Sequence, residues 1–181
     1  MQLALSMNEP IEISVVQDLE ALFRDHYGRL VRTLTLVSGD RENAADAVQE
    51  AFVAAHLRWR RVKRYDDPVG WIRRVAINRL RDGHRRSTRK ERALERMAAT
   101  VPREALDPTP ELAHRSGDDA ATMAMLGGLP RQQRLCLALF YVDGLSVAET
   151  ARALELSEGA VKFHLHEGRK RLRGQQGGQS T

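Results

Sequence analysis

Apolar residues of this 181-residue chain recur three and four positions apart, the spacing that aligns side chains along one face of an α-helix. The first such run comprises Leu19, Leu22, Phe23, His26, Tyr27, Leu30 and Leu34. The pattern returns after residue 120, and few stretches alternate between apolar and polar residues as half-buried strands do. The sequence therefore predicts an all-α fold.

The helical pattern fades between Ser87 and Asp119, where the stretch VPREALDPTPEL brings three prolines close together. Proline lacks the backbone donor that a helix needs, so this stretch disfavours a continuous helix. We expect two small helical domains joined by a flexible linker. The expected division is an N-terminal extension over 1–17, a first domain over 18–87, a linker over 88–119, a second domain over 120–173 and a disordered tail over 174–181.

The net charge of +5 is unevenly distributed. Residues 58–92 contain 14 basic and 4 acidic residues, and residues 161–181 contain 5 basic and 1 acidic residue, so the rest of the chain is acidic on balance. A merely solvated surface would mix the two signs. The segregation instead predicts two separate contacts with a polyanion such as nucleic acid.

The segment from Gly144 to Gly174 predicts a helix-turn-helix. Ser146 and Glu149 have the spacing of a capping box, so a short helix should begin there, and Ser157 should cap the next helix. An ordinary helical hairpin would show the same apolar pattern, but the basic residues at its end favour DNA binding. In the second helix we expect Val161, Leu165, Gly168 and Leu172 to face the core, and Lys162, Phe163, His166, Arg169, Lys170 and Arg173 to face outward.

A basic helix is predicted from Pro68, with Asp67 as its N-cap, to about Arg86. Just before and within it, aromatic residues stand among basic ones, a mixture that suits stacking on unpaired nucleotides. Trp71 fits core packing equally well. A polar stripe opposite the apolar side of this helix comprises Arg74, Asn78, Arg81 and Arg85.

An earlier helix, which Asp40 can cap, carries two different sides. Its apolar side includes Val48, Phe52 and Ala55. Its polar side includes Asp46, Gln49 and Glu50.

Several classes of protein do not fit the sequence. No apolar run is long enough to cross a bilayer and the first residues do not resemble a secretory signal, so we expect a cytoplasmic protein without membrane insertion. The single Cys136 lies in an apolar run and should be a buried hydrophobe. The six histidines form no HExxH motif and no phosphate-binding glycine loop occurs, so we expect no metal, no cofactor and no independent catalysis.

Two motifs resemble a known family. DAVQEAFVAA followed by DDPVGWIRRVAINRLRDGHRR resembles region 2 of the extracytoplasmic-function (ECF) group of bacterial RNA polymerase sigma factors. LGGLPRQQRLCLALFYVDGLSVAETARALELSEGAVKFHLHEGRKRLR resembles their region 4. The resemblance covers about two thirds of the chain and implies a transcription initiation factor that binds core RNA polymerase and promoter DNA. It leaves open whether an anti-sigma protein holds the two domains shut.

The resemblance also implies roles for particular residues. The helix that binds the clamp helices of the polymerase's largest subunit corresponds to Asp46, Val48, Gln49, Glu50 and Phe52. The surface that captures the −10 element and holds a flipped-out base corresponds to Lys63, Arg64, Tyr65, Trp71, Arg74, Asn78, Arg81 and Arg85. The −35 element would be contacted by Ser157, Lys162, Phe163, His166, Glu167, Arg169, Lys170 and Arg173, and the polymerase flap by Leu129, Pro130 and the helix that follows.

The second motif departs from the family at VKFHLHEG. Phe163 and His164 stand where a small polar residue and an arginine are more common, and Glu167 stands where a basic residue is common. Glu167 could accept a hydrogen bond from a cytosine amine or pair with Arg171 one turn later. The stretch AVKFHL also resembles LuxR-type DNA-binding domains, which are the alternative family, but those domains do not carry the first motif.

Overall fold

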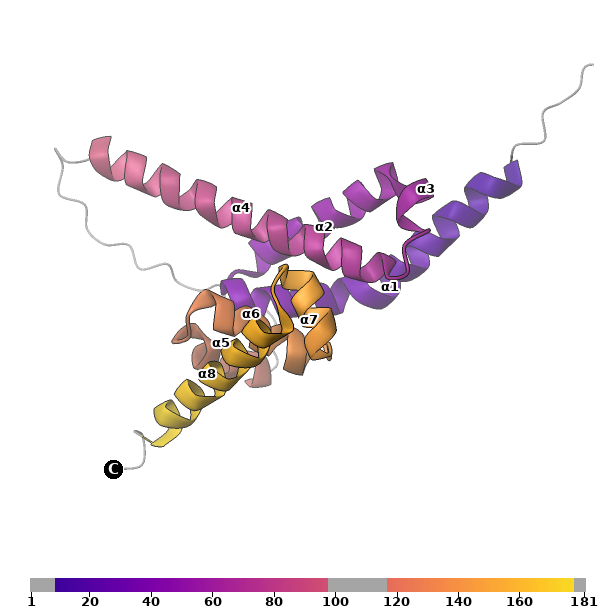
Figure 1. The fold of residues 1–181 in the computed structure, drawn as a ribbon. Helices are drawn as coiled ribbons and strands as arrows, with labels where there is room; N and C mark the ends of the chain where they lie inside the picture. Colours follow the sequence, from indigo (N-terminus) through magenta and orange to yellow (C-terminus); the bar gives the residue numbers. More distant parts are fainter. Residues whose placement is uncertain (1–8, 98–116, 178–181) are drawn as a thin grey trace, which may run out of the picture.

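The computed structural model describes residues 9–97 and 117–177, and the secondary structure within these ranges is helical, which confirms the all-α prediction (Figure 1). The first body comprises α1 (Glu9–Ser38), α2 (Arg41–Leu57), α3 (Trp59–Val62) and α4 (Pro68–Met97). The second comprises α5 (Gly117–Gly127), α6 (Arg131–Leu137), the π-helical turn η1 (Ala138–Val142), α7 (Val147–Leu154) and α8 (Glu158–Gly177). In Figure 1 the second body lies against α1 and the first half of α4.

The core of the first body is formed where α1, α2 and α4 pack on one another. Large side chains from α1 and α4 fill it, and α2 contributes small alanines that allow the helices to approach closely. Each fully buried leucine or isoleucine side chain stabilises this packing by about 1.5–3 kcal/mol. The buried residues include Leu30, Leu34, Ala44, Ala51, Ala55, Ile72 and Ile77.

The helix starts lie where the capping residues predicted them. Asp40 accepts a hydrogen bond from the backbone nitrogen of Asn43 at 3.0 Å, and Asp67 accepts one from that of Gly70 at 2.7 Å. A Cβ on Gly70 would meet the Asp67 carboxylate, which would then have to move from its capping position. The capping interactions therefore fix the turn that leads into α4.

The second body has its own core around α6, η1, α7 and α8. Leu139 and Val161 are fully buried, and so is Cys136, as predicted. Burial raises the pKa of the Cys136 thiol to about 11. A Cβ on Gly168 would lie 2.8 Å from the Leu137 side chain, so this glycine lets α8 pack closely on α6.

Some helix ends differ from the predicted ones. α4 continues to Met97 instead of ending near Arg86, because the residues from Ser87 onward, STRKERALERM, are mostly strong helix formers. α1 begins at Glu9, inside the expected extension, and α8 continues to Gly177, inside the expected tail. The prolines of the expected linker lie outside the described residues. Among the helices described, none combines the length and the apolar character needed to cross a membrane.

Candidate functional site

The outward side of α2 is acidic and apolar together. Asp46, Gln49 and Glu50 are exposed, as the sequence predicted, and Glu50 pairs with Arg79 of α4 at 3.2 Å. Beside them lie Val53 and Leu57, whose exposed fractions are 54% and 76%. These residues line a shallow hollow of about 530 Å³ between α2 and α4. We call Asp46, Gln49, Glu50, Val53 and Leu57 the α2 surface.

The structure corrects the predicted composition of this surface. Val48 and Phe52 are buried, and the Phe52 ring packs edge-on against Phe23 of α1 with centroids 5.0 Å apart. They therefore hold α2 in the core and are not available to a partner. Sequence reasoning missed Val53 and Leu57, although they follow Gln49 and Glu50 at helical spacing and could have been found on that side.

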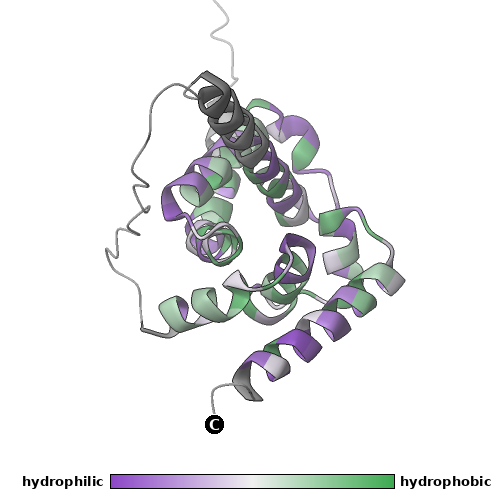
Figure 2. Cartoon of the chain, turned by 90° about the vertical axis from the view of Figure 1, so that its left-hand side faces the viewer, coloured by the Kyte–Doolittle hydropathy of each residue, from purple (hydrophilic) through white to green (hydrophobic). Residues whose placement is uncertain are grey.

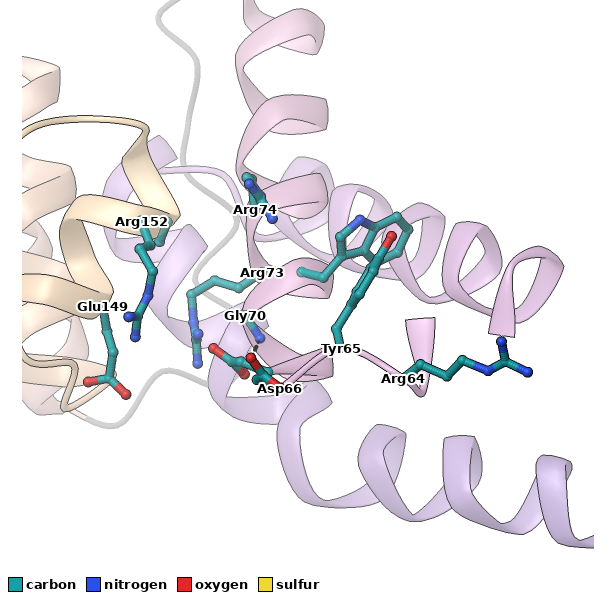
Figure 3. A pocket seen from close by; sticks show the side chains of 11 residues that line it. Arg64, Tyr65, Asp66, Gly70, Arg73, Arg74, Glu149 and Arg152 are labelled. Atoms are coloured by element: carbon teal, nitrogen blue, oxygen red, sulfur yellow. Dashed lines mark hydrogen bonds between the residues drawn. The ribbon is translucent and has the colours of Figure 1, made fainter. Parts of the chain in front are cut away.

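The start of α4 borders a cavity of about 910 Å³ that lies between the two bodies. From the first body, Tyr65, Trp71 and Arg74 line it, and from α7 come Glu149 and Arg152. Figure 3 shows Arg73 and Arg152 extending on facing sides of this space, and Arg64 also lines it. The sequence singled out Tyr65, Trp71 and Arg74 but neither Arg73 nor the residues of α7.

The aromatic residues of this cavity differ in burial. Tyr65 is 37% exposed, whereas Trp71 is half-buried and packs against the core. Trp71 packs against the core, which is one of the two alternatives that the sequence left open, and it also lines the cavity. Stacking of Trp71 on unpaired nucleotides stays a prediction.

The predicted polar stripe of α4 continues away from the cavity. Asn78 is exposed, Arg74 and Arg81 are half-buried, and Lys63 in the preceding loop is exposed. The side chain of Arg85 lies outside the described residues. The apolar side of α4 is buried on the opposite side, as the periodicity predicted.

A buried ion-pair cluster joins the two bodies. Asp143, at the end of η1, is fully buried, and its two carboxylate oxygens lie 2.6 Å from Nε of Arg73 and 3.1 Å from Nε of Arg29. The Arg73 side chain is only 7% exposed. We call these three residues the Asp143 cluster. Sequence reasoning missed it, because no local spacing relates residues 70 positions apart.

Two further polar contacts cross the same interface. Arg32 of α1 pairs with Asp119 of α5 at 2.7 Å, and Arg134 of α6 donates a hydrogen bond to the backbone carbonyl of Val37 at 2.9 Å. The interface thus holds α7 against α4, and α5, α6 and η1 against α1.

The capping box of α7 is formed as predicted. The Glu149 carboxylate accepts hydrogen bonds from the Ser146 hydroxyl at 2.6 Å and from the Ser146 backbone nitrogen at 2.8 Å. These hydrogen bonds lower the pKa of Glu149 below its usual range. Glu149 therefore stays ionised at the edge of the cavity.

The helix α8 has the two faces that its sequence predicted. Ser157 caps it by accepting a hydrogen bond from the backbone nitrogen of Ala160 at 3.1 Å. Val161 and Leu165 are buried against α6 and α7. Figure 2 shows strongly hydrophilic residues along its C-terminal half. The exposed residues include Lys162, Phe163, His166, Arg169, Lys170 and Arg173.

The structure does not support a surface ion pair for Glu167. Within the described part of the chain, Glu167 is half-buried and forms no ion pair. Arg171, its expected partner, instead donates a hydrogen bond to Gln133 of α6 at 3.2 Å. Contact of Glu167 with DNA stays a prediction.

Comparison with protein families finds two matches that follow one another along the chain. Residues 22–90 match Sigma-70 region 2, and residues 120–172 match Sigma-70, region 4. The match to region 2 covers the first body, so the LuxR-type alternative, which explains only the second, is not favoured.

Known proteins of similar sequence and fold agree with these matches. The ECF RNA polymerase sigma factor SigM of Mycobacterium tuberculosis is 33% identical over 154 residues, which cover 84% of this chain and 74% of SigM. The fold is similar to that of CnrH in complex with the cytosolic domain of CnrY, with a TM-score of 0.62, 24% identity and coverage of 91% and 90% of the two chains. It is also similar to the sigma factor RpoE in complex with the anti-sigma factor NepR from Bartonella quintana, with a TM-score of 0.64, 18% identity and coverage of 87% and 96%. From its two matched regions and its similarity to SigM, this chain belongs to the ECF group of the sigma-70 family of RNA polymerase sigma factors.

Proposed function

We propose that this transcription initiation factor works through three separate surfaces: the α2 surface binds core RNA polymerase, the start of α4 captures the −10 element, and α8 reads the −35 element. The observation that carries the proposal is the separation of charge along the structure. One surface is acidic and apolar, whereas the other two are basic and lie on different bodies. A protein that contacts DNA at a single place would need only one basic surface.

The α2 surface suits a protein partner better than DNA. Its exposed carboxylates Asp46 and Glu50 would repel phosphates, whereas they can pair with basic side chains of a protein. Val53 and Leu57 add apolar area that a partner can bury, at about 25 cal/mol per Å². The sigma-factor resemblance makes the clamp helices of the polymerase's largest subunit the expected partner.

The start of α4 suits a single strand with a flipped-out base. Tyr65 and Trp71 supply aromatic surface beside Arg74, and Asn78 offers an amide further along the same helix. Base stacking on an aromatic side chain contributes about 1–3 kcal/mol per base, which can offset the cost of unpairing. This strand capture would open DNA without ATP.

The outward face of α8 suits duplex DNA. Lys162, Phe163, His166 and Glu167 lie in its first half, where a recognition helix contacts base edges, and the following basic residues would contact phosphates.

Catalysis is left to the polymerase. Among the described residues, no cluster of three or more potential metal ligands occurs, and the proposed surfaces need no nucleophile.

An anti-sigma protein is a further expected partner. RpoE, whose fold is similar, is bound to the anti-sigma factor NepR, which supports a similar partner for this chain.

Run-off transcription tests the proposal. Core RNA polymerase is incubated with genomic promoter fragments of the source bacterium, with and without the purified chain. The chain should produce transcripts with defined start sites that core polymerase alone does not produce. Absence of such transcripts, or turnover of nucleic acid by the chain without polymerase, would contradict the proposed function.

A further inference from the structure

An exposed aromatic residue lies on the proposed DNA-reading face of α8. Phe163 is 60% exposed and occupies the second turn of the helix, beside the exposed Lys162 and one turn before Glu167. The neighbouring Val161 and Leu165 are buried on the other side, so Phe163 does not contribute to the core. Single exposed apolar residues are common on protein surfaces, so the argument depends on its position and chemistry.

The orientation of the Phe163 ring is restricted by a second ring. The ring of His164 lies 5.5 Å away, centroid to centroid, at an interplanar angle of 66°. His164 is half-buried, and its ring packs edge-on with that of Phe163. A side chain with only two rotatable bonds, held in this way, loses little conformational entropy when it contacts a ligand.

The chemistry of the ring limits what Phe163 can read. It has no hydrogen-bond donor or acceptor, so it cannot recognise the polar edge of a base, and stacking is blocked because bases in a duplex are already stacked on one another. The one apolar group that the major groove displays is the C5-methyl group of thymine, and phenylalanine is among the residues that contact it.

We propose that Phe163 is a specificity-determining residue that selects a thymine in the −35 element by apolar contact with its C5-methyl group. The proposal rests on the proposed function of α8. The neighbouring Lys162, His166 and Glu167 have polar groups for other base positions, so the specificity assigned to Phe163 concerns one position of the element.

Replacement of thymine by deoxyuridine tests the proposal, because it removes only the methyl group. Holoenzyme assembled from core polymerase and the full chain first selects its preferred −35 sequences from a randomised duplex library at fixed salt. Each thymine of the selected element is then replaced in turn by deoxyuridine. We expect about fourfold weaker binding at one position, the effect of one methyl-sized apolar group.

The variant Phe163→Ala should bind more weakly and lose the difference between thymine and deoxyuridine at that position only. Tyr141→Ala is the matched control, because Tyr141 is 57% exposed and lies in η1, outside the helix-turn-helix. That variant should keep the fourfold difference. In a further comparison, the selected thymine is replaced either by cytosine or by 5-methylcytosine, which differ only in the methyl group. The wild-type chain should bind the 5-methylcytosine DNA more tightly than the cytosine DNA, whereas Phe163→Ala should bind the two alike.

The outcomes separate this inference from the proposed function. A selected element without thymine, or a deoxyuridine effect that persists in Phe163→Ala, overturns the role of Phe163 and leaves the −35 assignment intact. A holoenzyme that selects no −35 sequence contradicts the proposed function of α8, and the role of Phe163 with it.

Discussion

Asp143 is the position at which one substitution should separate the two bodies. The carboxylate is fully buried and accepts a hydrogen bond from Arg73 of α4 while it also pairs with Arg29 of α1. In Asp143→Ala both arginines lose this partner. The Arg29 side chain is 48% exposed and can be solvated where it stands, but the Arg73 side chain is only 7% exposed.

The expected cost follows from that difference in burial. Removing one partner of a buried ion pair destabilises by about 3–5 kcal/mol, whereas a half-exposed pair contributes about 0–1 kcal/mol. Because Arg73 regains water if α7 moves away from α4, the molecule can avoid most of this cost by opening. A change of this size shifts the equilibrium between closed and open forms by roughly two to three and a half powers of ten.

Small-angle X-ray scattering measures the opening as an increase in the radius of gyration, with far-UV circular dichroism as a check that both bodies stay helical. Asp119→Ala is the matched control, because it also removes a carboxylate that pairs with α1, but the Arg32 side chain in that pair is 55% exposed. It should leave the radius of gyration unchanged.

A second substitution tests whether the unpaired charge of Arg73 causes the opening. Adding Arg73→Met to Asp143→Ala removes the unpaired buried charge and should restore the closed form. If Asp143→Ala behaved like Asp119→Ala, or if Arg73→Met did not reverse its effect, the reasoning from the buried charge would be refuted.

Three further predictions concern the other surfaces. The pair Asp46→Arg and Glu50→Arg should abolish co-purification with core polymerase without loss of helix content, because both side chains are exposed; undiminished co-purification would refute the role of the α2 surface. Asn78→Ala should reduce run-off transcription from duplex promoters far more than from templates already mismatched over the −10 region, and equal losses would indicate a structural role. Burial, with a smaller contribution from Arg29, lowers the pKa of His26, so the unfolded chain binds more protons and the free energy of unfolding should fall as pH drops below about 6.5. Urea unfolding at about pH 7.5 and about pH 5.5 should show a smaller pH effect in His26→Gln, and an unchanged effect would assign it to other groups.

Much of the fold could be predicted because its determinants are local. Asp40, Asp67, Ser146 and Ser157 mark helix starts by hydrogen bonds to residues only three positions away. The faces of α8 follow equally well from the apolar period, because a helix fixes which side chains share a face. On α2 the apolar spacing places Val48 and Phe52 on the side opposite the acidic residues. The family resemblance alone had added them to the residues expected to bind polymerase.

The contacts between the two bodies could not be predicted in this way. Arg73 stands among many basic residues, and Asp143 stands in a short turn. Charged residues in such sequences are usually exposed to solvent, so nothing in the sequence indicates that these two are buried. Their pairing depends on how α7 packs on α4, and no spacing along the chain encodes that packing. The short helix α3 was missed for a related reason: Trp59 and Val62 are buried, but the surrounding arginines hide their apolar pattern.

The closed arrangement has a consequence for promoter binding. Elements named for positions −35 and −10 lie about 25 base pairs apart, which is ~85 Å of duplex at about 3.4 Å per base pair. In the closed form α7, which belongs to the body that we propose binds the −35 element, faces the cavity at the start of α4, and the Asp143 cluster holds it there. If the −10 and −35 elements bind at the proposed surfaces, both can be bound at once only after the bodies separate. The 19 residues between α4 and α5 can span at most about 65 Å when fully extended. On the proposed surfaces, the free energy of the Asp143 cluster is therefore one that polymerase and DNA must overcome when they bind.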